Sequence, residues 1–504
     1  MGWGYKYGGK MRHKSPRPLQ AYFFLLFSFL LSTSGCDSEM PTEFSKISEI
    51  NSYDPNHVLT VFEDVKLKTA IFNIIIASRT ASNRNNYITA ADINNISYLY
   101  LKQKGIKDLR GIKYCQNLVS LDISENPIKD LSPLTWLKKL SSLNISKCGI
   151  SDISQLASIT TIEDLTASNN QISDISVLSS FRKLKSLDLS INKIVDISSL
   201  KKLDELSVAY LYWNSIEDIS PLKDHANLRI LHVVNNKIKV LPELSGCTML
   251  TTLYANNNQI SKINGIKNLQ YLQSISLDAN QIAEVSGISN LPNLRILTMG
   301  YNHITSITGM SDLNSLEQLS LYDNKLSDIS FLSGMPNIKL LWLGSNHVSN
   351  FPALLDLKNL EYLQISNNNV RDISFLQYLT SLKNLDMGGN NVGNLDVIAS
   401  LKNLEILQVE NNNLSNIDIV INFKNLTYLD IDYNSISNID VIKQLDHLNF
   451  LEMAYNNVND LTPIIECKGM RENSFLMIVG NPLSDVAKNE QIPTLQDRGV
   501  YVVF

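Results

Sequence analysis

The sequence predicts an α/β repeat solenoid, a horseshoe with a parallel sheet along its concave side and short 3₁₀ or α-helical turns on its convex side. Three observations support this fold class. One pattern of leucine, isoleucine and asparagine returns at multiples of 22 residues through most of the 504-residue chain. A polar phrase such as DIS follows many of the copies. Segments with a different pattern lie at both ends, where a solenoid needs caps to cover its core.

The repeating pattern is clearest in LVSLDISENPI, residues 118–128, which reads L-x-x-L-x-L-x-x-N-x-I. Because strand side chains alternate between two faces, the apolar slots point inward and stack on the same slots of neighbouring units. Cys148 and Lys104 occupy the asparagine slot in two units, and Asn481 follows after a step of 25 residues, which gives about 18 units. The regular asparagines are Asn126, Asn170, Asn192, Asn214, Asn236, Asn258, Asn280, Asn302, Asn324, Asn346, Asn368, Asn390, Asn412, Asn434 and Asn456.

This spacing resembles the leucine-rich repeat, and the 22-residue length with the DIS phrase is similar to the SDS22-like and internalin-like classes over residues 60–504. The resemblance implies that each asparagine side chain bonds backbone groups at the turn after its strand, so that successive asparagines form a buried ladder. A buried amide is tolerable only when its hydrogen bonds are made. Cysteine is the known alternative in this slot, which accounts for Cys148.

The second half of the units predicts a short helical turn. Ser132, Ser176 and Ser220 each precede apolar residues at i, i+3 spacing, and a serine there can cap the turn. Pro133 and Pro221 follow at the first helical position, which suits proline. These segments are too short for long helices, so 3₁₀ turns or one to two α turns are expected on the convex side.

The ends of the chain complete the predicted domain organisation. Residues 61–95 are expected to form a helical N-terminal cap similar to that of internalin-like proteins, with Thr89 as an N-cap. Residues 96–490 carry the repeats. Residues 491–504 are expected to form a C-terminal cap of a helix and a strand, and residues 36–60 are expected to be a polar tether.

Residues 1–35 have the features of a signal peptide. Basic residues without acidic ones precede AYFFLLFSFLL, an apolar stretch that is too short to span a bilayer and suits a signal h-region. The following STSGC resembles a bacterial lipoprotein signal, in which Cys36 is lipidated and becomes the first mature residue. The alternatives are a secretory signal cut near Gly35 and an uncleaved anchor, and either Met1 or Met11 serves as the start. We therefore expect an exported protein, lipid-anchored to a bacterial membrane, at the cell surface or in the periplasm.

Charge and motifs argue against several classes of function. Removal of residues 1–35 takes away five positive charges and no negative ones, so the formal net charge falls from −5 to −10, which disfavours nucleic-acid binding. The sequence contains no catalytic motif, P-loop, dinucleotide fingerprint or metal-ligand spacing. Cys115, Cys247 and Cys467 share one apolar slot and are expected in the core. The chain is therefore expected to be non-enzymatic, without cofactor or metal.

The slots four and two residues before each asparagine are expected on the concave sheet surface. They are small and polar in the first units, aromatic in the middle, where YLYWN (210–214) supplies three rings, and acidic towards the end. Aromatic side chains with polar tips anchor protein interfaces, and an acidic zone suits a basic partner; stacking between rings and chance are the alternatives. The candidate partner-binding residues are Tyr210, Tyr212, Trp213, His232, Tyr254, Tyr301, Tyr322, Trp342, Asp386, Glu410, Asp430, Asp432 and Glu452.

The sequence is compatible with three functions to different degrees. The first is a binding module displayed at the cell envelope, which grips a protein, or alternatively a glycan, with its concave face, similar to internalin-like adhesion and recognition proteins. The second is an intracellular scaffold resembling SDS22, which binds a protein phosphatase, and the export signal disfavours it. The third is an enzyme, which the lack of a catalytic cluster disfavours. The protein is expected to be a monomer.

Overall fold

The computed structural model describes residues 62–79, 88 and 90–504, and all of them belong to one compact unit. The predicted signal peptide and tether, together with Cys36 and Thr89, lie outside the described residues. Within the described part of the chain, no helix combines the length and the apolar character needed to cross a bilayer.

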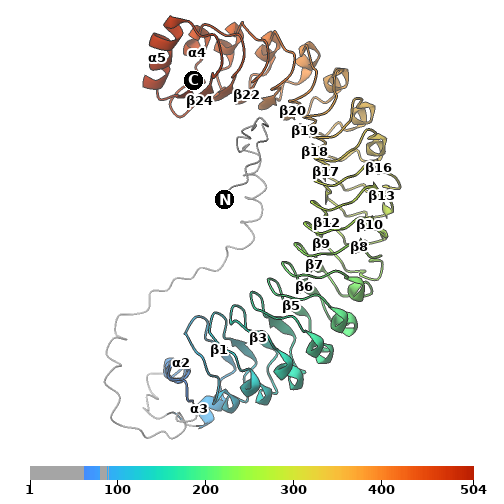
Figure 1. Ribbon diagram of the computed structural model, residues 1–504, viewed down its shortest axis with the longest axis vertical. Helices are drawn as coiled ribbons and strands as arrows, with labels where there is room; N and C mark the ends of the chain where they lie inside the picture. The colour runs from blue at the N-terminus through green and yellow to red at the C-terminus, as the bar shows by residue number, and fades with distance from the viewer. Residues whose placement is uncertain (1–61, 80–87, 89) are drawn as a thin grey trace, which may run out of the picture. The chain divides into compact units, whose positions relative to one another are not determined.

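A parallel sheet of 19 strands lines the concave side of the solenoid and confirms the predicted fold class (Figure 1). Each strand pairs with the strands of the neighbouring units, and equivalent residues lie side by side, as Leu121 and Leu143 do. The middle residue of each strand points into the core and its two neighbours point outward. The strands are β1 (Tyr98–Tyr100), β2 (Ser120–Asp122), β3 (Ser142–Asn144), β4 (Asp164–Thr166), β5 (Ser186–Asp188), β6 (Val208–Tyr210), β7 (Ile230–His232), β9 (Thr252–Tyr254), β12 (Ser274–Ser276), β15 (Ile296–Thr298), β17 (Gln318–Ser320), β18 (Leu340–Trp342), β19 (Tyr362–Gln364), β20 (Asn384–Asp386), β21 (Ile406–Gln408), β22 (Tyr428–Asp430), β23 (Phe450–Glu452), β24 (Phe475–Met477) and β25 (Tyr501–Val503).

Short helices form the convex side of most units, but the prediction that serine caps them is wrong. The Asp130 carboxylate accepts hydrogen bonds from the N–H and the hydroxyl of Ser132, both at 2.9 Å, and Asp218 does the same for Ser220. The aspartate caps the turn because its carboxylate reaches the N–H two residues ahead. The helices of the repeat region and the C-terminal cap are η4 (Ile112–Tyr114), η5 (Ser132–Trp136), η6 (Ser154–Ser158), η7 (Ser176–Ser180), η8 (Ser198–Lys202), η9 (Ser220–Leu222), η10 (Ser330–Gly334), η11 (Pro352–Asp356), η12 (Ser374–Tyr378), η13 (Asp396–Ser400), η14 (Asp418–Asn422), η15 (Asp440–Gln444), α4 (Thr462–Glu466), η16 (Ala487–Gln491) and α5 (Ile492–Asp497).

Small parallel sheets replace these helices in the middle of the solenoid, and there the prediction of helical turns is wrong. Gly265, Gly287 and Gly309 occupy equivalent positions with φ of +109°, +72° and +66°. Such angles suit glycine, and they turn the chain between two short extended segments where other units begin a helix. The extra strands are β8 (Val240–Leu241), β10 (Lys262–Ile263), β11 (Ile266–Lys267), β13 (Glu284–Val285), β14 (Ile288–Ser289) and β16 (Ser306–Ile307), paired as β8–β10, β11–β14 and β13–β16.

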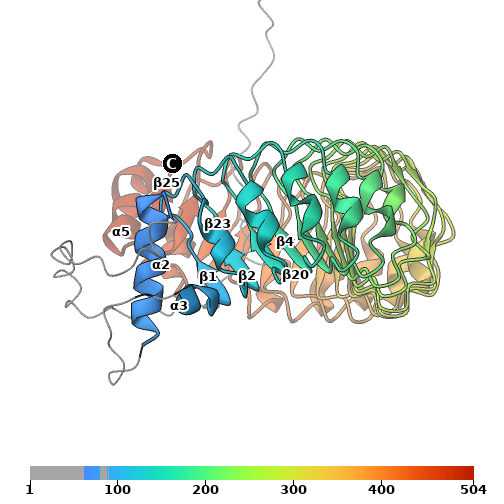
Figure 2. The same ribbon diagram turned by 90° about the horizontal axis from the view of Figure 1, so that it is seen from below.

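Helices α2 (Val65–Ala77) and α3 (Ala90–Asn94) stand at the β1 end of the solenoid (Figure 2). Asp64 caps α2, because its Oδ1 accepts two N–H groups of the first helical turn at 2.8 and 3.0 Å. Its Oδ2 accepts the N–H of Lys107 at 2.8 Å. The same carboxylate therefore starts the helix and ties it to the first repeat unit.

The other end is closed by α5 and by β25, the last strand of the sheet. Gln491, just before α5, accepts the N–H of Leu461 in the last regular unit at 2.8 Å. Gln155 makes the same bond to the equivalent Leu131 inside the stack, at 2.6 Å. The C-terminal cap thus supplies a hydrogen-bond acceptor to the Leu461 N–H, as a following repeat unit does for Leu131.

The asparagine ladder implied by the sequence is present and joins each unit to the one before it. In Asn346, Nδ2 donates to the carbonyl of Leu321 in the preceding unit at 2.9 Å and to that of Leu343 in its own unit at 3.0 Å. Its Oδ1 accepts the N–H of Leu326, also in the preceding unit, at 2.9 Å. Equivalent bonds recur along the stack, for example at Asn236. The ladder therefore fixes both the turn after each strand and the spacing of the units.

Cys148 shows what the ladder loses without an amide. Its Sγ lies 3.3 Å from the carbonyl oxygen of Ile123, which an asparagine would bond, but a thiol has no equivalent of Oδ1. The N–H of Ile128 bonds instead to the carbonyl of Asn126, at 2.8 Å. The slot accepts cysteine because the backbone finds a local substitute for the missing acceptor.

The substitution Asn346→Ala is expected to lower the free energy of unfolding by roughly 2–4 kcal/mol, because buried N–H and C=O groups lose their partners. Urea unfolding followed by circular dichroism measures the change. Cys148→Asn is the matched control with the opposite sign, since the amide restores an acceptor for the N–H of Ile128. Equal stability of Asn346→Ala and the wild type would contradict the role given to the ladder.

Candidate binding surface

Outward side chains form three rows on the concave sheet. The first, second and third rows lie six, four and two residues before the ladder residue, and for Asn214 they hold Val208, Tyr210 and Tyr212. A rim row follows one residue before the ladder residue, at the turn that ends the strand, and holds Trp213 in this unit. The sequence predicted the second and third rows, whereas the first row and the separate rim row come from the structure.

The rim row has a left-handed backbone, with φ of +55° at Trp213. Asparagine suits this conformation and occupies it at Asn169, Asn235 and Asn257. Large side chains occupy it elsewhere at a cost of about 1–2 kcal/mol per residue. Glu125, Lys147 and Ser345 have a similar φ, so the left-handed backbone belongs to the repeat turn and not to particular side chains. At the apolar and aromatic members of the row, which are exposed, burial does not offset the cost. These strained rim residues are Ile191, Trp213, Tyr301, Tyr433 and Tyr455.

Three of the predicted residues, Tyr210, Tyr212 and Tyr254, meet around a fourth, His232, on or just after strands β6, β7 and β9. The ring centroid of His232 lies 4.6 Å from that of Tyr212. Tyr210 and Tyr254 contact the imidazole edge to face, with centroids 6.1 and 5.5 Å away. Trp213 belongs to the rim row of the same region and is 60% exposed. Of the three rings of YLYWN, those of Tyr210 and Tyr212 therefore lie on the sheet surface, and that of Trp213 lies in the rim row.

Burial lowers the pKa of His232 to about 4, and the negative charge of Asp188 opposes only part of this effect. The surrounding rings exclude the water that would solvate a charged imidazole. The histidine is therefore neutral at physiological pH. The group of Tyr210, Tyr212, His232 and Tyr254, called the His232 cluster below, presents uncharged rings with polar tips.

Two ring pairs lie further along the sheet. Tyr301 in the rim row and Tyr322 in the third row meet edge to face, with centroids 5.4 Å apart. Trp342 contacts Tyr362, a first-row residue that the sequence analysis missed, at 5.1 Å. Gly344 leaves room for Tyr322, since a Cβ there would lie 3.1 Å from the ring. Strand β12 separates these pairs from the His232 cluster, so the predicted aromatic zone consists of two groups.

The predicted acidic residues lie along strands β20 to β23. Asp386 is bonded within the sheet, because its Oδ2 accepts Nε2 of Gln364 at 2.9 Å and the hydroxyl of Ser366 at 3.0 Å. Glu410 stands over Gly388, whose missing side chain leaves room for the carboxylate. Both acids are thus accommodated by small or polar neighbours on the adjacent strands.

Asp430, Asp432 and Glu452 form the tightest group of carboxylates, with one oxygen of each within 4.8 Å of the others. Burial, helped by the charge of Glu452, raises the pKa of Asp432 to about 7 against the hydrogen bond from the Ala454 N–H. Burial and then the charge of Glu410 raise the pKa of Asp430 well above its ordinary value. Carboxylate oxygens suit hard cations, but acidic residues often gather without an ion, so no metal is assigned.

The first row becomes aromatic at the C-terminal end, a feature that was not among the predictions from the sequence. Tyr428, Phe450, Phe475 and Tyr501 stand on consecutive strands from β22 to β25. Successive ring centroids lie 4.7, 4.4 and 5.8 Å apart. The strand alternation that predicted the second and third rows, extended by one more step of two residues, would have identified this row.

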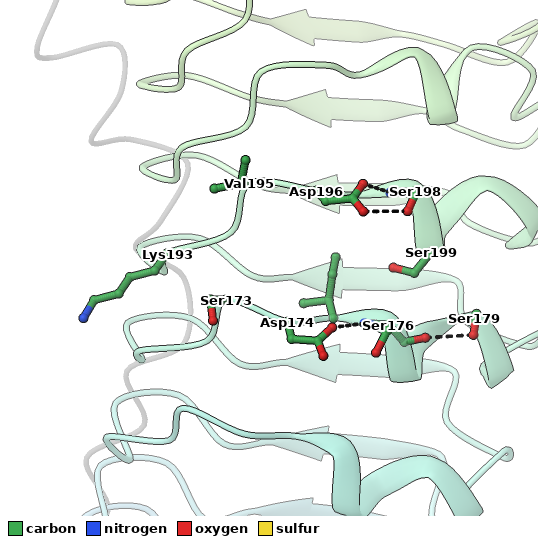
Figure 3. A pocket seen from close by; sticks show the side chains of 10 residues that line it. Ser173, Asp174, Ser176, Ser179, Lys193, Val195, Asp196, Ser198 and Ser199 are labelled. Carbon is green, nitrogen blue, oxygen red and sulfur yellow. Dashed lines mark hydrogen bonds between the residues drawn. The ribbon is translucent and has the colours of Figure 1, made fainter.

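The convex surface carries a groove between two units, drawn in Figure 3. Its polar groups are the repeated caps of the solenoid. Asp174 accepts the N–H of Ser176 at 2.8 Å, and Asp196 accepts the N–H and the hydroxyl of Ser198, both at 2.8 Å. Because other units make the same bonds, the groove belongs to the scaffold and is not a candidate site.

A family model described as a leucine-rich repeat region matches residues 164–396. No curated protein is similar enough in sequence to be matched. Among solved structures, an internalin from Listeria monocytogenes is 25% identical, with a TM-score of 0.53 over 77% of this chain and 100% of that chain.

Two further solved structures show the same fold at lower identity. A leucine-rich-repeat protein of Leptospira interrogans is 21% identical, with a TM-score of 0.60 over 82% of this chain and 97% of that chain. The ectodomain of an Arabidopsis thaliana membrane receptor kinase was solved in complex with Casparian strip integrity factor 2. It is 20% identical, with a TM-score of 0.57 over 77% of this chain and 53% of that chain.

His232 is expected to titrate with a pKa of about 4, and Tyr212→Ser is expected to move this pKa towards 6.5 by exposing the ring. NMR of the imidazole resonances during an acid titration measures both values. The lowered pKa also makes the free energy of unfolding depend on pH. Between pH 6.5 and about 4 the unfolded chain binds a proton at this imidazole and the folded chain does not. Full stability is therefore present above pH 6.5, and it decreases as the pH falls towards 4. A wild-type pKa of 6.5 or more would contradict the buried cluster.

Proposed function

Because the chain belongs to the leucine-rich-repeat proteins, with repeats of the internalin-like kind, we propose that it is a non-enzymatic module that binds a protein partner with its concave face. The observation that carries this proposal is the neutral His232 cluster, with the exposed Trp213 on the adjoining rim. Large rings with polar tips on a rigid surface are the usual anchors of protein interfaces.

The neighbouring unit shows that the fold does not require these rings. Asp188 and Ser190 precede Asn192 in the slots that hold Tyr210 and Tyr212 one unit later, and the two strands pair in register. The scaffold therefore accepts small side chains at this surface. Ring stacking stabilises the cluster, but it does not account for an exposed tryptophan in a strained rim position. We attribute the rings to a contact outside the chain.

The shape of the surface favours a macromolecular ligand. Neighbouring strands lie about 4.8 Å apart, so the rows present an open, gently curved platform over many units. The plant receptor ectodomain with the same fold was solved with a bound factor, which supports binding as the role of this architecture. A glycan stacked on the rings is the alternative ligand, and identification of the captured partner distinguishes the two.

We place the module at a bacterial cell envelope, where it acts in adhesion or recognition, as the internalin resemblance implies. Residues 1–35 support export, and the cysteine after them supports a lipid anchor at Cys36. An intracellular SDS22-like scaffold is the alternative. The two differ in whether the N-terminal segment is cleaved and Cys36 is modified.

The variant Tyr210→Ser/Tyr212→Ser/His232→Ser is expected to weaken partner binding by at least about 30-fold, because it removes the central rings of the interface. The partner is first captured by a photoreactive amino acid placed at Asn257, and its affinity is then measured by surface plasmon resonance. Serine already occupies the second row at Ser276, so the variant keeps the fold.

The matched control for this experiment is Tyr271→Ser/Tyr378→Ser, which removes two exposed rings that lie away from the concave sheet. It is expected to bind the partner as the wild type does. Equal affinity of the triple variant and the wild type would overturn the role of the His232 cluster.

Metabolic labelling with a fatty acid is expected to label the wild type and not Cys36→Ala, because the thiol is the acceptor of the lipid. Protease treatment of intact cells is expected to remove the repeats if they are displayed at the surface. A labelled protein protected from protease would place the module in the periplasm. An unlabelled, cytosolic chain with its N-terminus intact would favour the SDS22-like alternative.

A further inference from the structure

We propose that the last strands of the sheet form a docking surface for an extended protein segment that carries lysine or arginine side chains. This inference rests on the proposed function, because it describes the partner that part of the concave face would take. The residues of this C-terminal docking surface are Tyr428, Phe450, Phe475 and Tyr501 in the first row, Asp430, Asp432 and Glu452 in the second and third rows, and Tyr433 and Tyr455 in the rim row.

Stacked rings form one wall of this surface. The rings of Tyr428 and Phe450 have centroids 4.7 Å apart and planes 17° apart, and those of Phe450 and Phe475 are 4.4 Å and 18° apart. Tyr501 continues the row and is 67% exposed. Stacked rings cover one another's faces, so the wall presents apolar C–H edges. Serine fills the same row at Ser120 and elsewhere in the first units, so the fold does not require this wall.

Tyr433 and Tyr455 form the opposite wall on the rim. Their centroids lie 4.5 Å apart with planes 15° apart, and they are 54% and 48% exposed. Both have a left-handed backbone, with φ of +54° and +53°. Asn367 and Asn411 occupy the same slot in nearby units with φ of +53° and +52°, a conformation that asparagine adopts at lower cost than tyrosine. The repeat turn sets this backbone in every unit, so what distinguishes these two units is a pair of exposed rings where asparagine suffices, and we assign the pair to contact with the ligand.

The carboxylates lie between the two walls, because the second and third rows separate the first row from the rim on each strand. Oxygens of Asp430, Asp432 and Glu452 lie within 4.8 Å of one another. From β20 to β25, all within the described chain, the outward rows and the rim contain no lysine, arginine or histidine. Burial raises the pKa of Asp430 and of Asp432, so without a partner these two groups hold protons more readily than exposed carboxylates do. A cation placed here opposes this shift and favours the charged carboxylates, which stabilise it in turn.

Lysine and arginine side chains match both features of this surface. Their aliphatic stems pack on apolar rings while their charged heads reach carboxylates. The guanidinium of arginine also pairs with a carboxylate through two parallel hydrogen bonds. A bare metal ion would use the carboxylates and leave the two aromatic walls unused. The combination of walls and charges points to a basic segment of a protein.

Fluorescence anisotropy with the purified full chain tests this assignment. The probes are labelled peptides of alternating arginine and serine, or of lysine and serine. We expect them to bind the wild type, and a glutamate–serine peptide not to bind. Asp430→Asn/Glu452→Gln is expected to weaken binding by at least about tenfold, since it removes charge and keeps the hydrogen-bond acceptors. Failure of both basic peptides to bind would overturn the proposal.

One control variant and one calcium titration distinguish a specific binding surface from general charge attraction. Asp122→Asn/Asp188→Asn replaces the same number of carboxyl groups in the second row at the other end of the sheet, and it is expected to change the affinity by less than about twofold. An equal loss in both charge variants would overturn the proposal. Calcium that binds the wild type in calorimetry while the basic peptides do not would also overturn it, and would assign the carboxylates to a metal ion.

The role of the wall formed by Tyr433 and Tyr455 can be tested with a variant that is expected to fold. Tyr433→Asn/Tyr455→Asn installs the residue that the rim row uses elsewhere, so thermal unfolding is expected to show equal or higher stability. The same variant is expected to lose at least about tenfold in affinity for the arginine peptide. Undiminished peptide binding by this folded variant would overturn the part given to the rim tyrosines.

The outcomes distinguish this inference from the proposed function. If the His232 cluster variant loses the captured partner while no basic peptide binds the wild type, the docking surface is overturned and the proposed function stands. If the basic peptides bind as expected but the His232 cluster variant keeps its partner, the C-terminal docking surface stands and the His232 cluster is overturned.

Discussion

Hydrogen bonds from the buried asparagine side chains are the constraint on which the rest of the structure depends. Each bonds backbone groups of its own turn and of the preceding unit, as Asn346 does with Leu343 and Leu326. Because these bonds span neighbouring units, loss of an asparagine leaves buried polar groups of two units unpaired. Asn481 makes the same bonds after a step of 25 residues, so the ladder fixes the contact between units and not the length of the convex segment. The left-handed backbone of the rim row belongs to the same turn, since it precedes the asparagine that must point inward. Cys148 shows that one partial substitute is tolerated.

The asparagine ladder and the apolar core stabilise the fold. The side chains of the outward rows can therefore differ from unit to unit without changing the backbone. The first units use this freedom for serine and aspartate, which bond each other locally, as Ser190 and Asp188 do. Later units use it for rings and carboxylates. The rim row shows the difference most clearly, because isoleucine, tryptophan and tyrosine there act against local stability while asparagine does not. These residues are therefore not required by the fold, which is why we include the tryptophan and the tyrosines in the proposed binding surface.

The concave sheet carries two chemically different regions. The His232 cluster is neutral, since burial keeps its imidazole unprotonated, and it offers rings and hydroxyl groups. The C-terminal docking surface is acidic between two apolar walls, and burial raises the pKa of its Asp432 to about 7. A partner that covered both would combine aromatic anchoring at one region with charge complementarity at the other. In such an arrangement the rings supply most of the affinity. The charges set the orientation of the partner and its association rate.

The sequence by itself determined the period, the direction of each strand's side chains and the ladder, because an apolar pattern with fixed asparagines permits only one way to bury the core. It also placed Tyr210, Tyr212 and the acidic residues on the concave face, since strand alternation is local. Tertiary structure decided what depends on backbone angles and on neighbouring units. Glycine at positive φ changed convex helices into strands, Asp130 rather than Ser132 became the cap, and first-row rings such as Phe450 stacked across strands. The ring stacking requires residues 22 or more apart to be in contact, whereas the glycine turns and the aspartate cap depend on local backbone angles. The spacing of residues along the sequence gives neither the contacts nor the angles.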